Sequence, residues 1–230
     1  MPTFDILSKC QPSRSYRVAR VRSAYDFTAP SIETHLSGEI VFPDDWRIGV
    51  ITGHSGTGKT TIARHLWAEH CVDQFVYSAP SVIDDFQDHV ADEAIFKTLH
   101  RVGFGSIPSW LKPYSVLSRG EQMRVDLARA ILECPSPVVV DEFTATVDRD
   151  VARFACLAAR KAIRESDKQF IAVSCHDDFI EWLQPDWVFD TNVMRMKKKT
   201  ESASIYDWMF ESVGGVPGCS LPSIIISVAR

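Results

Sequence analysis

The stretch Gly53-His54-Ser55-Gly56-Thr57-Gly58-Lys59-Thr60 decides the fold predicted for this chain. It follows a compact apolar run, Arg47 to Thr52, that is typical of a buried strand, and it precedes a segment with helical apolar spacing. Glycines allow the backbone to curl so that successive N–H groups point inward at the oxygen atoms of a phosphate. A stretch of the form G-x-x-x-x-G-K-T between a strand and a helix therefore predicts a phosphate-binding loop.

The polar side chains of this loop suit a nucleoside triphosphate with its metal ion. Lys59 supplies a cation for the β- and γ-phosphates, and the Thr60 hydroxyl is a suitable ligand for Mg²⁺. The helix that begins near Lys59 adds the positive end of its dipole. We therefore expect ATP and Mg²⁺ as cofactors. The residues expected to bind the nucleotide in this region are Gly53, His54, Ser55, Gly56, Thr57, Gly58, Lys59, Thr60 and Thr61.

Two acids end a second apolar strand, Val138 to Val140. In open α/β sheets, ligands bind at the carboxyl ends of the strands. Asp141 is expected to hold Mg²⁺, and Glu142, on the opposite side of the strand, is expected to polarise an attacking water. Together with the phosphate loop, this pair predicts a P-loop NTPase and leaves the type of reaction open.

Apolar patterns along the rest of the chain alternate between strands and helices. Strands are predicted at 16–28 (with a turn), 47–52, 75–77, 138–140, 170–174 and 187–189, and helices over 59–70, near 88–100, after Ser118 and through Val151, Ala155, Ala158 and Ala162. This alternation predicts an α/β fold with a mainly parallel sheet flanked by helices. Because periodicity is lost near the end, we predict an ATP-binding domain over 1–196 and a C-terminal appendage over 197–230.

The segment Leu117-Ser118-Arg119-Gly120-Glu121-Gln122 resembles the LSGGQ-type signature of ABC-type ATPases, as does the helix that follows it. A hydroxyl and backbone N–H groups at a helix N-terminus form a second anion site. In that family two nucleotide-binding domains face each other, and each ATP lies between one phosphate loop and the partner's signature. The resemblance implies a dimer when ATP is bound, with Ser118 and Gly120 contacting the partner's nucleotide. We expect a homodimer, and a heterodimer is the alternative.

Further residues match the family in chain order. Thr144–Asp148 looks like its D-loop, with Asp148 as the acid, and His176 follows the third core strand where the family carries a switch histidine. Tyr25 lies where the family places an aromatic that stacks on adenine. Phe27 is an alternative, and plain packing of either ring is a third interpretation. The catalytic residues that the resemblance implies are Lys59, Glu142 and His176.

The chain also departs from the transporter members of that family. Arg119 replaces a signature glycine, and 57 residues separate Lys59 from Leu117, which implies a reduced helical subdomain. Transporter subunits use that region to bind their membrane partner, so a membrane partner is not expected. No glutamine ends the segment Phe75–Tyr77, and Gln87 is the nearest later candidate for the family's Q-loop residue.

Several segments, among them Val82–Asp85 and Trp182–Trp187, are similar to small soluble ABC-type ATPases of phages and bacteria that are often joined to a GNAT-type acetyltransferase domain. The resemblance implies a soluble ATPase whose dimer closes on an unknown client protein. The alternatives are the nucleotide-binding subunit of a membrane transporter and a DNA-maintenance ATPase. The latter usually carries coiled-coil or zinc insertions, and the 57-residue interval has neither heptads nor cysteine pairs.

The composition narrows the class of protein. The 230 residues carry 25 basic and 30 acidic side chains, a net charge of −5, which does not indicate a general nucleic-acid binder. Arginines at 14, 17, 20 and 22 and the lysines at 197–199 leave local phosphate contacts open, with a solvated strand face as the alternative for the arginines. No apolar run of membrane-spanning length and no secretory signal are present, so we expect a cytoplasmic protein.

Overall fold

The computed structural model describes residues 2–27, 31–72, 75–144 and 147–198. Within these residues the central sheet has the strand order β4-β5-β6-β3-β7-β8. Its strands are β3 (Ile48–Thr52), β4 (Cys71–Val72), β5 (Val138–Val140), β6 (Phe170–Ser174), β7 (Trp187–Asp190) and β8 (Arg195–Lys198). All neighbours pair in parallel except β7 and β8, which are antiparallel. The predicted α/β fold with a mainly parallel sheet is confirmed.

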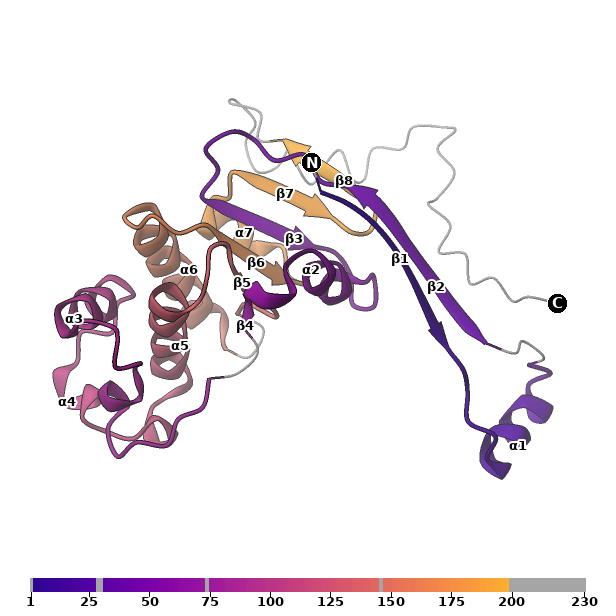
Figure 1. Ribbon diagram of the computed structural model, residues 1–230, viewed down its shortest axis with the longest axis horizontal. Helices are drawn as coiled ribbons and strands as arrows, with labels where there is room; N and C mark the ends of the chain where they lie inside the picture. The colour runs from indigo at the N-terminus through magenta and orange to yellow at the C-terminus, as the bar shows by residue number, and fades with distance from the viewer. Residues whose placement is uncertain (1, 28–30, 73–74, 145–146, 199–230) are drawn as a thin grey trace.

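Helices cover both faces of this sheet (Figure 1). They are α2 (Lys59–Trp67), α3 (Asp92–Arg101), α4 (Ile107–Trp110), α5 (Arg119–Glu133), α6 (Arg149–Arg164) and α7 (Asp178–Leu183), with 3₁₀ turns η1 (Ala68–His70), η2 (Val82–Asp85) and η3 (Tyr114–Val116). Alternate strand residues point to opposite faces, so Val50 joins a core with α3, α5, α6 and α7, whereas Ile51 joins a second core with α2. All five residues of β3 are buried, as expected for a central parallel strand.

A hairpin projects from the second core, and we call it the arm, residues 3–39. Its strands β1 (Thr3–Cys10) and β2 (Ile32–Glu39) pair antiparallel over their whole length, and the segment between their outer ends forms α1 (Tyr16–Ala24). Figure 1 shows the strands leading away from the sheet, with α1 at the far end. Phe4 and Leu36 are the buried apolar residues of the two strands and anchor the arm beside α2.

The strand predicted at 16–28 is wrong, because residues 16–24 are helical. The Ser15 hydroxyl accepts a hydrogen bond from the backbone N–H of Val18 and caps the helix. The valines suggested a strand, but the cap and the alanines and arginines between them favour a helix.

The strand predicted at Phe75–Tyr77 is also absent, and the short edge strand is β4, earlier in the chain. Residues 75–77 instead pack against α5. The helix predicted near 88–100 begins later, at Asp92. On α6 the buried face runs through Ala152, Ala155, Cys156, Ala159 and Ala162, so Val151 and Ala158 of the predicted face are only partly buried.

The sheet ends beyond the predicted domain boundary. Strand β8 crosses 196/197 and pairs with β7 as far as Lys198, so residues 197 and 198 of the predicted appendage belong to the sheet. The rest of that predicted appendage, 199–230, lies outside the described residues. Across the ranges that the structure describes, each helix is too short or too polar to cross a bilayer.

Candidate functional site

Most of the residues predicted to bind the nucleotide or to catalyse its hydrolysis lie at the carboxyl edge of the sheet. The parallel strands β6, β3 and β7 end in register at this edge, and β5 ends two residues earlier, at Val140 opposite Ala172. Asp141 and Glu142 follow β5, His176 follows β6, and the phosphate loop connects β3 to α2. The edge therefore brings residues far apart in sequence to one side of the sheet.

The phosphate loop has a backbone that glycine favours. Gly53 has a φ of +143° and Gly58 a φ of +89°, and Gly58 caps the N-terminus of α2. The Lys59 ammonium group folds back over the loop and donates hydrogen bonds to the carbonyl oxygens of Gly53, at 2.9 Å, and His54, at 2.8 Å. A positive charge and the N-terminus of α2 thus lie at the same turn, which suits an anion.

Thr191 and Asn192 support this loop, and sequence reasoning did not identify them. Asn192 Oδ1 accepts a hydrogen bond from the His54 backbone N–H at 3.0 Å, and the hydroxyls of Thr191 and Thr57 lie 2.5 Å apart. Thr191 also donates to the carbonyl oxygen of Thr52 at 3.0 Å. The available signal was their position: they directly follow β7, the parallel neighbour of β3.

The close packing of Gly58 gives a first prediction. A Cβ atom added there would overlap the buried side chain of Leu36 on the arm, whereas one added at Gly56 would meet open space. The two glycines have similar φ angles, +89° and +83°, so Gly58→Ala and Gly56→Ala share a backbone cost of about 1–2 kcal/mol. We expect Gly58→Ala to lower the free energy of unfolding by about 1–3 kcal/mol more, measured by urea denaturation without nucleotide. If both variants lose the same free energy of unfolding, the proposed contact between Gly58 and Leu36 is wrong.

Glu142 stands in an uncommon backbone conformation at the end of β5. Its φ is +51°, its side chain is exposed, and its N–H donates to Asp141 Oδ1 at 2.9 Å. The next residue, Phe143, is buried and its N–H donates to the Val173 carbonyl oxygen at 3.0 Å, which holds the turn against β6. Positive φ in a non-glycine residue is concentrated at functional sites. The turn leaves the Glu142 carboxylate free to contact water.

The loop after β6 carries the predicted switch histidine. His176 is exposed, and its backbone N–H donates to the Ser174 hydroxyl at 3.3 Å. The neighbouring Asp177 accepts a hydrogen bond from the Thr52 hydroxyl at 2.6 Å, which ties this loop to the end of β3. The geometry places the His176 imidazole in solvent beside the edge where the phosphate loop begins.

Asp148 caps the N-terminus of α6. Its carboxylate accepts hydrogen bonds from the N–H groups of Asp150 and Val151, at 3.0 and 3.1 Å. Residues 145 and 146 of the predicted D-loop lie outside the described residues.

The signature segment begins α5. Ser118 is the N-cap residue, and its N–H and hydroxyl donate to the Glu121 carboxylate at 2.9 and 2.8 Å. The Ser118 backbone hydrogen bond is the main reason that the pKa of Glu121 is lowered. Gly120 lies close to Val151 of α6. In the part of the chain that the structure describes, no hydrogen bond joins Ser118 or Gly120 to the phosphate loop.

Tyr25 is not brought to this site. Its side chain is 80% exposed, and its N–H closes the end of α1 by donating to the Val21 carbonyl oxygen. Figure 1 shows α1 at the outer end of the arm, well away from α2. The structure therefore does not support the predicted adenine contact, because the pairing of β1 with β2 carries residues 16–27 outward. The alternative, Phe27, belongs to the same outer segment.

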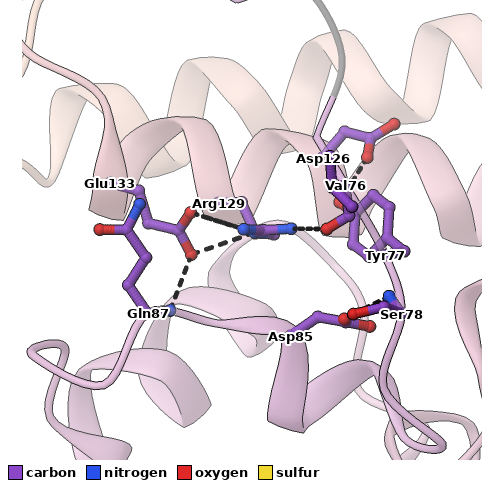
Figure 2. A network of polar contacts seen from close by, with 8 residues as sticks. All are labelled: Val76, Tyr77, Ser78, Asp85, Gln87, Asp126, Arg129 and Glu133. Carbon is purple, nitrogen blue, oxygen red and sulfur yellow. Dashed lines mark hydrogen bonds and ion pairs between the residues drawn. The ribbon is translucent and has the colours of Figure 1, made fainter.

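The segment Phe75–Ser78, near which the resemblance leads us to expect a Q-loop, packs against α5 (Figure 2). Arg129 forms an ion pair with Glu133, with N–O distances of 2.9–3.1 Å, and donates to the Val76 carbonyl oxygen at 3.0 Å. The side chains of the pair are only 8% and 2% exposed. Gln87 donates its backbone N–H to Glu133 at 3.3 Å, so it lies at this ion pair and not beside the phosphate loop.

A second contact joins the same segment to α5. The Asp126 carboxylate accepts hydrogen bonds from the hydroxyls of Tyr77, at 2.6 Å, and Tyr114, at 2.8 Å, and the two rings stack at 3.6 Å. Burial is the main reason that the pKa values of both tyrosines and of Asp126 are raised. These groups line a cavity of about 560 Å³ that extends to Asp141 and Glu142.

Solved structures share the fold of this chain. "Dimeric Structure of MJ0796, a Bacterial ABC Transporter Cassette" has a TM-score of 0.56 at 14% identity and covers 84% of this chain and 98% of that chain. The post-hydrolysis state of MJ0796 bound to ADP and Pi has a TM-score of 0.58 at 14% identity, with 85% and 97% covered. This chain has the fold of an ATP-binding cassette. A bacterial Atm1-family ABC exporter with ATP bound matches the same fold with a TM-score of 0.53 at 15% identity, covering 82% of this chain and 39% of that one.

Two curated relatives of this chain are ATP-binding proteins by name. "Inner membrane ABC transporter ATP-binding protein YddA" of Escherichia coli (strain K12) is 28% identical over 137 residues, 49% of this chain. "Phosphonates import ATP-binding protein PhnC 2" of Synechococcus sp. (strain JA-2-3B'a(2-13)) is 41% identical over 68 residues, 30% of this chain. Each match spans 24% of the relative's own length. No protein-family model matches the chain.

Proposed function

We propose that this protein is an ABC-type ATPase that binds and hydrolyses Mg²⁺-ATP and closes as a homodimer to act on a partner protein. The observation that carries the proposal is the carboxyl edge of the sheet, where the loop around Lys59 and the acids Asp141 and Glu142 follow parallel strands of one sheet. The cassette fold and the relatives' printed names support ATP as the nucleotide.

The residues at this edge fit the magnesium complex of a nucleotide. The Thr60 hydroxyl at the start of α2 and the Asp141 carboxylate after β5 are the oxygen ligands that Mg²⁺ prefers, and they would hold it. When bound, Mg²⁺ would neutralise charge on the phosphates. Lys59 would add a second positive charge, and Glu142 would orient water and accept its proton. His176 would contact the γ-phosphate from the neighbouring loop.

A homodimer would complete the site. Ser118 is exposed at the N-terminus of α5, and within the described residues it makes no hydrogen bond to the phosphate loop of its own chain. In the dimer, Ser118 and Gly120 would contact the nucleotide held by the partner chain, and Asp148 would lie near the interface. The MJ0796 cassette, which shares this fold, is dimeric in both solved structures, and this supports a dimer here.

The partner is proposed to be a client protein of a soluble ATPase. Between β4 and α5, the described residues form only two helices, α3 and α4, and two 3₁₀ turns. This region therefore has little surface on which a membrane subunit could bind. This reduction also agrees with the resemblance to small ATPases of phages and bacteria. The second candidate is a transporter subunit, which the names of both curated relatives favour. Co-purification with a membrane protein from the native cell would favour the second candidate.

Nucleotide binding gives a direct test. Hydrogen bonds to charged groups contribute about 1.5–3 kcal/mol each, so Lys59→Ala is expected to weaken ATP binding by about 10- to 100-fold. Titration calorimetry with Mg²⁺-ATP would measure this loss. The matched control is Lys97→Ala on α3, an exposed lysine outside the site, which should bind as the wild type does. Wild-type protein that does not bind ATP would overturn the proposed function.

A further inference from the structure

The arm has surface that its own fold does not cover. Its outer half is exposed, with Leu7 65% and Ile32 45% accessible, and α1 has no buried residue. Two-stranded hairpins are marginally stable in water unless they pack against something. A projecting hairpin that carries an exposed helix at its end is therefore well suited to contact another molecule.

Charge is concentrated at the end of this arm. Residues 11–27 contain four arginines and one acid, Asp26, whereas the remaining 213 residues carry 21 basic and 29 acidic side chains. The tip is thus positive at +3 on a chain that is otherwise negative at −8. Along the strands, by contrast, Lys9 forms an ion pair with Glu33, and the His35 ring contacts the Asp5 carboxylate. Charge complementarity calls for an anionic partner at the tip.

One face of α1 combines arginines with an aromatic ring. At 100° per residue, Tyr16, Arg17, Arg20 and Val21 lie on the same side of the helix, and all four are exposed. Tyr16 is 78% accessible, and Tyr25, just beyond the helix, is 80% accessible. No ion pair within the described residues engages Arg17 or Arg20. The guanidinium groups are therefore available to a ligand.

We infer that the tip of the arm, residues 14–25, binds single-stranded nucleic acid. Guanidinium groups match the geometry of phosphate oxygens and bind them with paired hydrogen bonds. Exposed tyrosine rings provide stacking surfaces for unpaired bases, which a duplex or an acidic peptide lacks. This surface is distinct from the ATP site and does not depend on hydrolysis.

Fluorescence anisotropy with a labelled oligonucleotide of about 20 nucleotides and the full chain would test the inference. The variant is Arg17→Gln with Arg20→Gln, and its matched control is Lys97→Gln with Arg153→Gln, which removes two exposed positive charges from α3 and α6. We expect the arm variant to bind about tenfold or more weakly and its salt slope, in log K against log salt, to fall by about 1.4. The control should bind nearly as the wild type does.

Two further measurements test whether the ligand stacks on Tyr16 and whether the arm variant remains folded. Tyr16→Ala should weaken binding while Tyr16→Phe should not, because phenylalanine retains the stacking surface. Thermal unfolding and basal ATP hydrolysis of the arm variant should equal those of the wild type. The inference is overturned if the arm variant and the control lose equal affinity. It is also overturned if duplex of the same sequence, or polyglutamate of equal charge, competes as well as the single strand.

Discussion

Glu142→Gln is expected to lower the rate of phosphate release by at least about 100-fold while ATP remains bound. The substitution preserves the size of the side chain but removes its ability to accept a proton from water. Because Glu142 is exposed at a turn held by Asp141 and Phe143, the variant should keep the local backbone. Phosphate release under saturating Mg²⁺-ATP would measure the rate.

The same variant also tests the dimer. ATP that is bound but not hydrolysed should hold two chains together, so light scattering after gel filtration with Mg²⁺-ATP should give twice the mass of one chain. Glu93→Gln, at an exposed acid in the first turn of α3, is the matched control and should hydrolyse ATP normally. A Glu142→Gln protein that stays monomeric with ATP bound would refute the sandwich dimer. Unchanged hydrolysis would remove Glu142 from the proposed mechanism.

The largest expected effect on stability follows from Arg129→Met. This change leaves the Glu133 carboxylate, 2% exposed, without its cation. Breaking a buried ion pair by removing one partner typically costs about 3–5 kcal/mol, because an uncompensated charge stays buried. The loss of the hydrogen bond to the Val76 carbonyl oxygen also releases the segment Phe75–Ser78. Urea denaturation, followed by circular dichroism, would measure the free energy of unfolding.

The double variant Arg129→Met with Glu133→Leu is the control for this prediction. Replacing both charges with apolar side chains of similar volume is often neutral or stabilising, so the double variant should recover most of the lost stability. A double variant as unstable as Arg129→Met alone would mean that the hydrogen bond to Val76, and not the ion pair, carries the effect. An unchanged stability in the single variant would contradict the burial of Glu133.

Features that depend on neighbouring residues were accessible from the sequence. The phosphate loop needs glycines at fixed spacing because its backbone takes positive φ angles, and this spacing can be read directly from the sequence. Residues 170–173 and 187–189 are unbroken apolar runs, as expected for strands that are buried on both faces of a sheet. The resemblance to ABC-type ATPases also predicted the cassette fold that the solved structures support.

Features that depend on distant residues were missed. The antiparallel pairing of β1 with β2 holds residues 16–24 far from the site, and no local sequence pattern predicts this pairing. Phe75–Tyr77 has the composition of a strand, yet Tyr77 and Val76 find their hydrogen bonds on α5, more than 40 residues later in the chain. Thr191 and Asn192 become part of the site only because β7 lies beside β3.

The sequence by itself determined the phosphate loop, the acids after β5 and the capped start of α5, because each depends on backbone conformations and side chains within a few residues of one another. The tertiary structure alone decided that these segments meet at one edge of the sheet, that Asn192 steadies His54, and that Tyr25 stands apart on the arm. The physical reason is that strand order and hairpin pairing are set by burial and hydrogen bonding between segments separated by tens of residues, which local patterns do not encode.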